Sequence, residues 1–219
     1  MKLKTILCAA ACLLLPQTVP AAGTGITVKA GTLGLGLELQ QALTKRFALR
    51  VGLNDYTYEY DTTKDDVNYS FDFNLESKAL MLDWHPFAGT FRLTAGMYRN
   101  DNALNGQAEA ASSYQIGNRT YTPSEIGTLY SDITFDDTAT YFGLGWGISP
   151  DSDGGFGIAV DLGLLKQGTP TVDLRAEGGT LVSDPQFQSD IQQEEQNLQE
   201  DLEEFDVYPV VSLGLSYRF

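Results

Sequence analysis

The sequence ends in VYPVVSLGLSYRF, residues 207–219, and this stretch decides the fold. Its odd-numbered positions carry mostly large apolar or aromatic side chains, whereas even positions such as Ser212, Gly214 and Ser216 are mostly small or polar. Alternation with a period of two residues is typical of a β-strand whose two faces meet different surroundings. The stretch therefore predicts a closing strand, either of a membrane barrel or of a soluble β-sandwich.

The carboxyl-terminal stretch resembles the closing strand of bacterial outer-membrane β-barrels, which ends in Phe with another aromatic residue two positions earlier. Those positions are Phe219 and Tyr217 here. The resemblance implies that these two residues form the signal that the barrel assembly machinery reads.

The amino-terminal segment has the features of a secretory signal peptide. Lys2 and Lys4 precede an apolar run over residues 6–15, which is too short to span a bilayer as a helix, and small residues precede a cleavage site after Ala21. We expect residues 1–21 to be removed and residues 22–219 to form one barrel domain in the Gram-negative outer membrane. Both cysteines lie in the removed part, so the mature chain has no thiol chemistry.

The charge of the chain excludes one class of partner. The net charge is −15, and loss of the signal peptide lysines makes it more negative. Such a surface does not bind nucleic acid through its phosphates, but it suits divalent cations or basic partners. The mature sequence has no segment apolar enough for a spanning helix, so a membrane protein with this sequence must be a closed barrel.

Alternating apolar residues predict seven clear strands. On one of them the parity changes near Asn54 and Asp55, which predicts a β-bulge, and Tyr56, Tyr58 and Tyr60 beyond it would suit an aromatic girdle at the membrane surface. Even parity from Phe156 to Ala176 predicts one strand about 70 Å long, which would protrude from the membrane. The seven strands are expected within residues 25–40, 47–60, 67–84, 91–97, 133–148, 156–176 and 207–219.

Short and long connections alternate between these strands, as they do in outer-membrane barrels. The chain as a whole resembles small opacity-like or OmpW-like outer-membrane proteins. We predict an all-β fold, an antiparallel transmembrane barrel of eight strands with one acidic amphipathic helix in an external loop. The eighth strand comes either from a split of residues 25–40 near Gly31 or from a hairpin over Tyr114–Tyr121.

Charged residues at inward strand positions predict a polar network in the lumen. Because buried charges must be paired, mixed signs suit a closed plug, and the alternative is a narrow path for a small solute. The predicted network consists of Glu38, Arg50, Glu76, Lys78, Arg92, Asp161 and Arg218.

The sequence predicts no catalytic residues and no cofactor site. The single histidine, His85, precedes Pro86 in a turn, with Asp83 nearby but no serine beside it, which favours a turn residue over a lipid-modifying active site. The glycines of GLGLG and GLGWG alternate with apolar residues and make room for large neighbours inside strands.

Residues 184–205 predict a helix, with Asp184 as N-cap and Pro185 in the first turn. Its acidic side chains either form a solvated cap or an external surface for divalent cations or cationic ligands, with Glu194, Glu195 and Asp201 as weak metal candidates. The expected function is that of a non-enzymatic surface protein, structural or adhesive; a narrow channel is the alternative, and a lipid-modifying enzyme comes third. Expected partners are outer-membrane lipids, lipopolysaccharide, the barrel assembly machinery and divalent cations.

Overall fold

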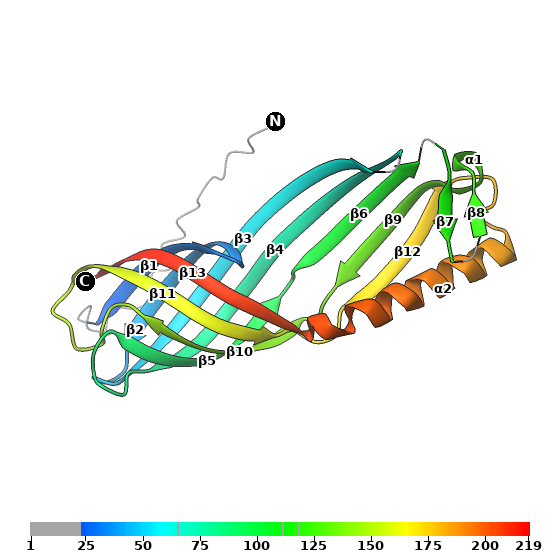
Figure 1. Cartoon of the computed structure of the whole chain (residues 1–219). Helices are drawn as coiled ribbons and strands as arrows, with labels where there is room; N and C mark the ends of the chain where they lie inside the picture. The colour runs from blue at the N-terminus through cyan, green and yellow to red at the C-terminus, as the bar shows by residue number, and fades with distance from the viewer. Residues whose placement is uncertain (1–22, 65, 111, 118) are drawn as a thin grey trace, which may run out of the picture.

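A computed structural model describes residues 23–219 except 65, 111 and 118. The expected signal peptide, residues 1–21, lies outside the described residues. The described chain is mainly antiparallel β-structure, drawn out into a barrel at one end and an open curved sheet at the other (Figure 1).

Eight strands form a closed ring, which confirms the predicted eight-stranded antiparallel barrel. β13 pairs with β1, which brings the first and last strands together, and pairing of the second half of β4 with β5 closes the ring. Around the ring the strands are β1 (Thr24–Gly31), β2 (Gly34–Ala42), β3 (Phe47–Lys64), β4 (Val67–Trp84), β5 (Phe91–Asn100), β10 (Thr138–Trp146), β11 (Gly155–Lys166) and β13 (Val207–Arg218).

The eighth strand is β1. It pairs with β2 from Thr24↔Gln41 to Gly31↔Gly34, so the chain turns between these glycines, as one of the two alternatives predicted. The hairpin over Tyr114–Tyr121 also exists, as β7 (Tyr114–Ile116) and β8 (Arg119–Tyr121), but it forms a separate two-stranded sheet.

The two ends of the barrel differ. At the turn end, where β13 finishes, residues 43–46, 85–90 and 147–154 make short connections between strands. Aromatic side chains gather on the outer surface here, where the rings of Phe91 and Trp146 lie 5.5 Å apart and those of Phe156 and Tyr217 4.8 Å apart. An apolar outer surface bordered by aromatic residues is typical of a membrane barrel.

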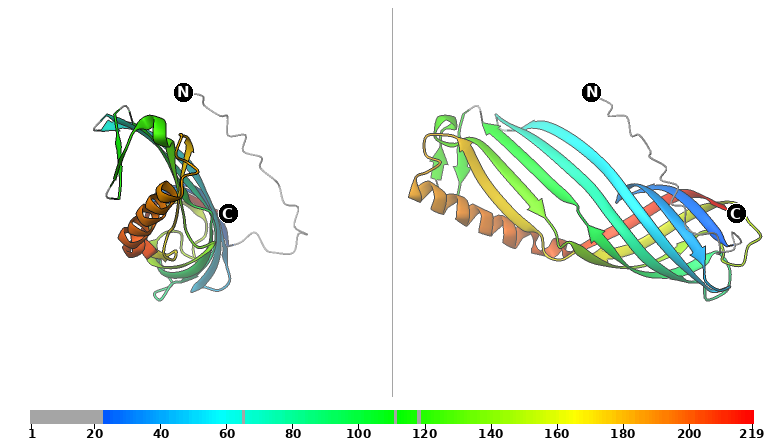
Figure 2. Two further views of the ribbon diagram at one scale, coloured as in Figure 1. Left: turned by 90° about the vertical axis from the view of Figure 1, so that its right-hand side faces the viewer. Right: turned by 180° about the vertical axis from the view of Figure 1, so that it is seen from behind.

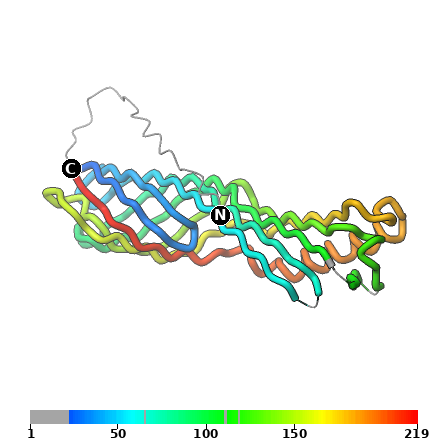
Figure 3. The backbone as a smooth tube through the Cα atoms, turned by 90° about the horizontal axis from the view of Figure 1, so that it is seen from above, coloured from blue at the N-terminus to red at the C-terminus, as the bar shows by residue number. Residues whose placement is uncertain are grey.

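At the opposite, loop end, β3 and β4 continue beyond the ring as part of an open sheet that we call the extension (Figures 2 and 3). Three more strands complete it in the order β4-β6-β9-β12. They are β6 (Ala103–Ala110), β9 (Gly127–Thr134) and β12 (Thr171–Gly178).

The prediction of a single strand from Phe156 to Ala176 is wrong. β11 ends at Lys166 and β12 begins at Thr171, with Gly168 at φ +78° and Pro170 between them. β11 lies in the barrel between β10 and β13, whereas β12 is the outermost strand of the extension. The chain therefore does protrude, but through a second strand.

The bulge predicted near Asn54 and Asp55 is also wrong, because β3 pairs with β4 without interruption from Phe47↔Trp84 to Lys64↔Val67. The apolar residues change faces instead. In the barrel part of β3 the apolar side chains, such as Leu53, point outward. Tyr58 lies in the extension and is separated from Arg50 by an even number of residues. Side chains with such a spacing share a face of the strand, so Tyr58 lies on the same face as Arg50, which points into the lumen. The tyrosines are thus not an outer girdle: they line the concave face of the extension.

The acidic helix is present as α2 (Pro185–Leu202), followed by the 3-10 turn η1 (Glu203–Asp206) that leads into β13. As predicted, Asp184 caps it and accepts hydrogen bonds from the backbone N–H groups of Gln186 and Phe187, at 2.9 and 3.1 Å. Phe187 and Ile191 are buried against the extension, together with β7, β8 and the short α1 (Pro123–Ile126). No helix within the described ranges is long and apolar enough to cross a membrane.

One side of α2 also protects the free edge of β12. The backbone N–H groups of Val172 and Leu174 donate to the side chains of Gln199 and Glu195, both at 3.1 Å. An uncovered edge strand would present these donors to other chains. α2 therefore covers the edge of the sheet without adding a strand.

Candidate functional site

The middle of the barrel is filled by a charge network of three basic and three acidic side chains. Arg50 lies at its centre: its Nη1 is 2.9 Å from Glu38 Oε2 and 3.2 Å from Asp161 Oδ2, and its Nε is 2.9 Å from Asp83 Oδ2. Arg92 reaches Asp161 Oδ1 at 2.7 Å. The six members, each buried, are Lys29, Glu38, Arg50, Asp83, Arg92 and Asp161.

The structure places the residues of the predicted lumen network in three locations. Glu38, Arg50, Arg92 and Asp161 meet in the charge network. Arg218 is buried at the turn end, where its Nη2 donates to the backbone oxygen of Pro150 at 2.6 Å.

Glu76 and Lys78 do not belong to the network. They are exposed on the outer face of β4 and form a long ion pair of 3.4 Å with each other. The assignment fails because inward positions of β4 are odd-numbered, as the buried Ala79, Met81 and Asp83 show.

Two members of the network, Lys29 and Asp83, were not predicted from the sequence. Lys29 Nζ lies 2.5 Å from Glu38 Oε1, its partner on the adjacent strand. Its role depends on β1 being a separate strand, which the sequence left open. Asp83 shows the same inward parity as Ala79 and Met81 and could have been found from it.

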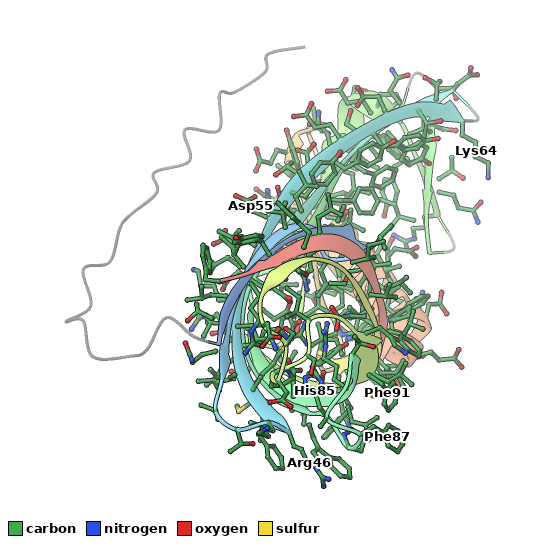
Figure 4. The ribbon with its side chains drawn as sticks, turned by 90° about the vertical axis from the view of Figure 1, so that its left-hand side faces the viewer. Arg46, Asp55, Lys64, His85, Phe87 and Phe91 are labelled. Atoms are coloured by element: carbon green, nitrogen blue, oxygen red, sulfur yellow. The ribbon has the colours of Figure 1, made fainter. Side chains whose placement is uncertain are left out.

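A second layer, of apolar and aromatic side chains, fills the lumen on the loop-end side of the network. Tyr98 and Tyr141 pack with ring centroids 5.7 Å apart. Tyr141 fits because its neighbours on β10 and β11 are glycines: a Cβ atom at Gly163 would lie 2.5 Å from its ring. Viewed from the turn end, side chains fill the ring (Figure 4). The buried members of this layer are Leu33, Ala79, Met81, Tyr98, Ala139, Tyr141, Leu165 and Val210.

His85 is a turn residue, buried at the turn end of the lumen (Figure 4). Its Nδ1 lies 2.7 Å from the backbone oxygen of Gly89, which holds the turn together. The nearby Asp83 accepts a hydrogen bond from Thr94 at 2.7 Å and pairs with Arg50. This geometry gives His85 a structural contact and places Asp83 in the charge network.

The three acidic metal candidates have different surroundings and share no contact. Glu194 accepts a hydrogen bond from the backbone N–H of Gly117 at 3.2 Å, Glu195 accepts one from Leu174, and Asp201 is exposed. In the part of the chain that the structure describes, no three His, Cys, Asp or Glu side chains come together to hold a metal ion.

The concave face of the extension forms an apolar pocket of about 520 Å³ above the plugged lumen, which we call the outer pocket. Phe73 and Leu75 of β4, Leu104 of β6 and Ile133 of β9 line one side. Leu202, Phe205 and the first residues of β13 line the other. The full set is Phe73, Leu75, Asn102, Ala103, Leu104, Ile133, Phe135, Gln167, Pro170, Leu202, Phe205, Val207, Tyr208 and Pro209.

An apolar outer face, an eight-stranded ring and a filled lumen define a small β-barrel of the outer-membrane type. Solved structures of CarO and CarO2 from Acinetobacter baumannii share this fold. Each matches with a TM-score of 0.60 and 18% identity, over 90% of this chain and 98% of the other. At this identity the likeness shows the fold alone.

The Ail protein of Yersinia pestis, an attachment invasion locus protein, also matches over 90% of this chain, with 11% identity. Its TM-score is 0.38, and the match covers 94% of that chain. No family model and no curated protein matches the sequence.

Proposed function

We propose that the protein is a non-enzymatic surface protein of the Gram-negative outer membrane whose binding function lies in the extension. One observation supports this most: the charge network and the aromatic layer fill the lumen, while the outer pocket and the concave sheet lie beyond it. Ligand-binding sites are typically concave and largely apolar.

In this proposal the loop end faces the outside of the cell, because outer-membrane barrels have short periplasmic turns and longer external loops. The barrel lies among lipids and lipopolysaccharide, and the assembly machinery reads Tyr217 and Phe219. Residues 22–219 form the mature barrel domain. We also propose that the protein belongs among the opacity-like or OmpW-like proteins, and that divalent cations act by neutralising the acidic side chains of α2.

Conductance tests the proposal against its alternative, a narrow channel. The protein refolded into planar bilayers is expected to give no single-channel steps, since Arg50 and Tyr141 block the lumen. A porin added to the same bilayer is the positive control. Discrete steps from the wild-type protein, changed in size by Arg50→Ala, would establish the channel instead.

Proteolysis of intact cells tests the orientation. Residues 179–184, between β12 and α2, are expected to be cut by protease added outside. Cleavage only after the outer membrane is opened would place the loop end in the periplasm and contradict the proposal.

A further inference from the structure

The outer pocket contains a polar group that the fold leaves without a partner. Asn102 lies between β5 and β6, is 8% exposed and lines the outer pocket. Its Oδ1 is buried and has no hydrogen-bond partner among the described residues. An unpaired buried acceptor is destabilising, and a ligand whose hydrogen-bond donor reaches Oδ1 from the pocket would remove this cost.

The rest of the lining is mainly apolar, so the main part of the ligand must be apolar too. Phe73, Leu104 and Ile133 come from three neighbouring strands, and Phe205, which is 59% exposed, closes the opposite side. A volume of about 520 Å³ lies in the range of small-molecule sites.

The charges near the pocket decide against an anion. η1, which contributes Phe205 to the lining, also carries Glu203, Glu204 and Asp206. A carboxylate or phosphate bound here would meet these acidic groups, and an apolar lining disfavours any full charge. An uncharged molecule avoids both costs.

We propose that the outer pocket binds an uncharged apolar molecule that carries one hydrogen-bond donor, such as a hydroxyl or an aromatic amine, with the donor bound to Asn102 Oδ1. This inference rests on the proposed function, because it gives the chemical class of ligand for the extension of a surface barrel.

Three probes of nearly the same shape test it: 1-aminoanthracene, anthracene and anthracene-1-carboxylate, which are a neutral donor, an apolar body without a donor, and an anion. Their binding to the full barrel in phosphatidylcholine nanodiscs is followed by fluorescence, with empty nanodiscs as background. We expect saturable binding and an affinity for the amine roughly fivefold above that for anthracene, since one hydrogen bond contributes about 1 kcal/mol. The carboxylate is expected to bind weakest.

Two variants locate the site. Asn102→Leu is expected to abolish the preference for the amine while anthracene still binds. Leu104→Trp fills the pocket and is expected to abolish binding of both, whereas the matched Asn105→Trp, on the opposite face of β6, is not. Heat-dependent migration in SDS gels shows that each variant is folded.

The inference is overturned by binding no stronger than to empty nanodiscs, by a preference that survives Asn102→Leu, or by tighter binding of the carboxylate. None of these results would imply that the barrel conducts ions or that its loop end faces the periplasm. Failure of this inference is therefore distinguishable from failure of the proposed function.

Discussion

Arg50 and Asp83 face each other inside the barrel from paired strands, with Nε and Oδ2 2.9 Å apart and both side chains at most 2% exposed. Arg50 also contacts Glu38 and Asp161, so a single guanidinium group pairs with carboxylates from three other strands. Removal of one partner from a buried ion pair is costly because the remaining charge is left without compensation.

Arg50→Leu is therefore expected to destabilise the barrel by about 3–5 kcal/mol. The measurement is the urea midpoint of reversible unfolding in phospholipid vesicles. Arg46→Leu, an exposed arginine in the neighbouring turn, is the matched control and should change stability by less than about 0.5 kcal/mol. Equal effects of the two substitutions would show that the network contributes nothing specific.

The contact between α2 and the free edge of β12 predicts a local change in hydrogen exchange. In the double variant Glu195→Ala with Gln199→Ala, the amides of Val172 and Leu174 lose their acceptors, so their exchange should become faster. Gln196→Ala with Glu200→Ala changes exposed positions of the same helix and should leave both amides protected. If both double variants exchange alike, α2 covers the edge through its apolar contacts alone.

Asp190 predicts a pH dependence in the extension. Its carboxylate accepts a hydrogen bond of 2.5 Å from the hydroxyl group of Tyr121, which, with Gln186 and Arg119, lowers the pKa of Asp190. A lowered carboxyl pKa contributes stability above the unfolded value of about 3.9, and this stability is lost as the pH falls through the folded value.

Carboxyl ¹³C NMR titration measures this directly. Tyr121→Phe keeps the ring that packs against Phe187, with centroids 5.1 Å apart, but removes the hydroxyl group. The pKa of Asp190 should rise in this variant, and β7 and β8 should detach from α2 at higher pH than in the wild type. An unchanged pKa would show that the hydrogen bond has no influence in solution.

The barrel was predictable because lipid on one side and a filled lumen on the other impose a period of two on every strand. The boundary of the extension was not recognised, because alternation separates two faces without showing which one meets lipid. Beyond Asn54 the apolar face of β3 is the concave one, and the sequence shows this change only as a shift of parity that a bulge would explain equally well. Glu76 and Lys78 were misplaced for the same reason.

The outer pocket could not be predicted from any single segment. Its lining combines residues as distant as Phe73, Asn102, Ile133 and Phe205, which come together only because β4, β6 and β9 are neighbours and η1 lies opposite them. Nor does local sequence distinguish Asn102 from other asparagines. Only the packed structure shows that its acceptor has no partner.

The end of α2 and the start of η1 predict a response to divalent cations. Glu200, Asp201, Glu203 and Glu204 follow one another closely, and no basic residue lies in the last turn. Like charges three or four residues apart destabilise a helix, and acidic groups at its carboxyl end also oppose its dipole. Since the described residues provide no clustered metal site, we expect Ca²⁺ or Mg²⁺ to act by neutralising these charges.

Hydrogen exchange of the refolded barrel tests this with millimolar Ca²⁺ or Mg²⁺ and with NaCl at equal ionic strength. Protection of residues 198–204 should increase more with the divalent cations, because a doubly charged ion compensates neighbouring carboxylates more effectively. Glu200→Gln with Glu204→Gln should raise protection without added cation and reduce the response, whereas Gln192→Asn with Gln193→Asn, which leaves the charge unchanged, should not. Protection from Phe187 to Leu202 that is the same in all solutions would contradict the prediction and leave α2 as a solvated cap on the extension.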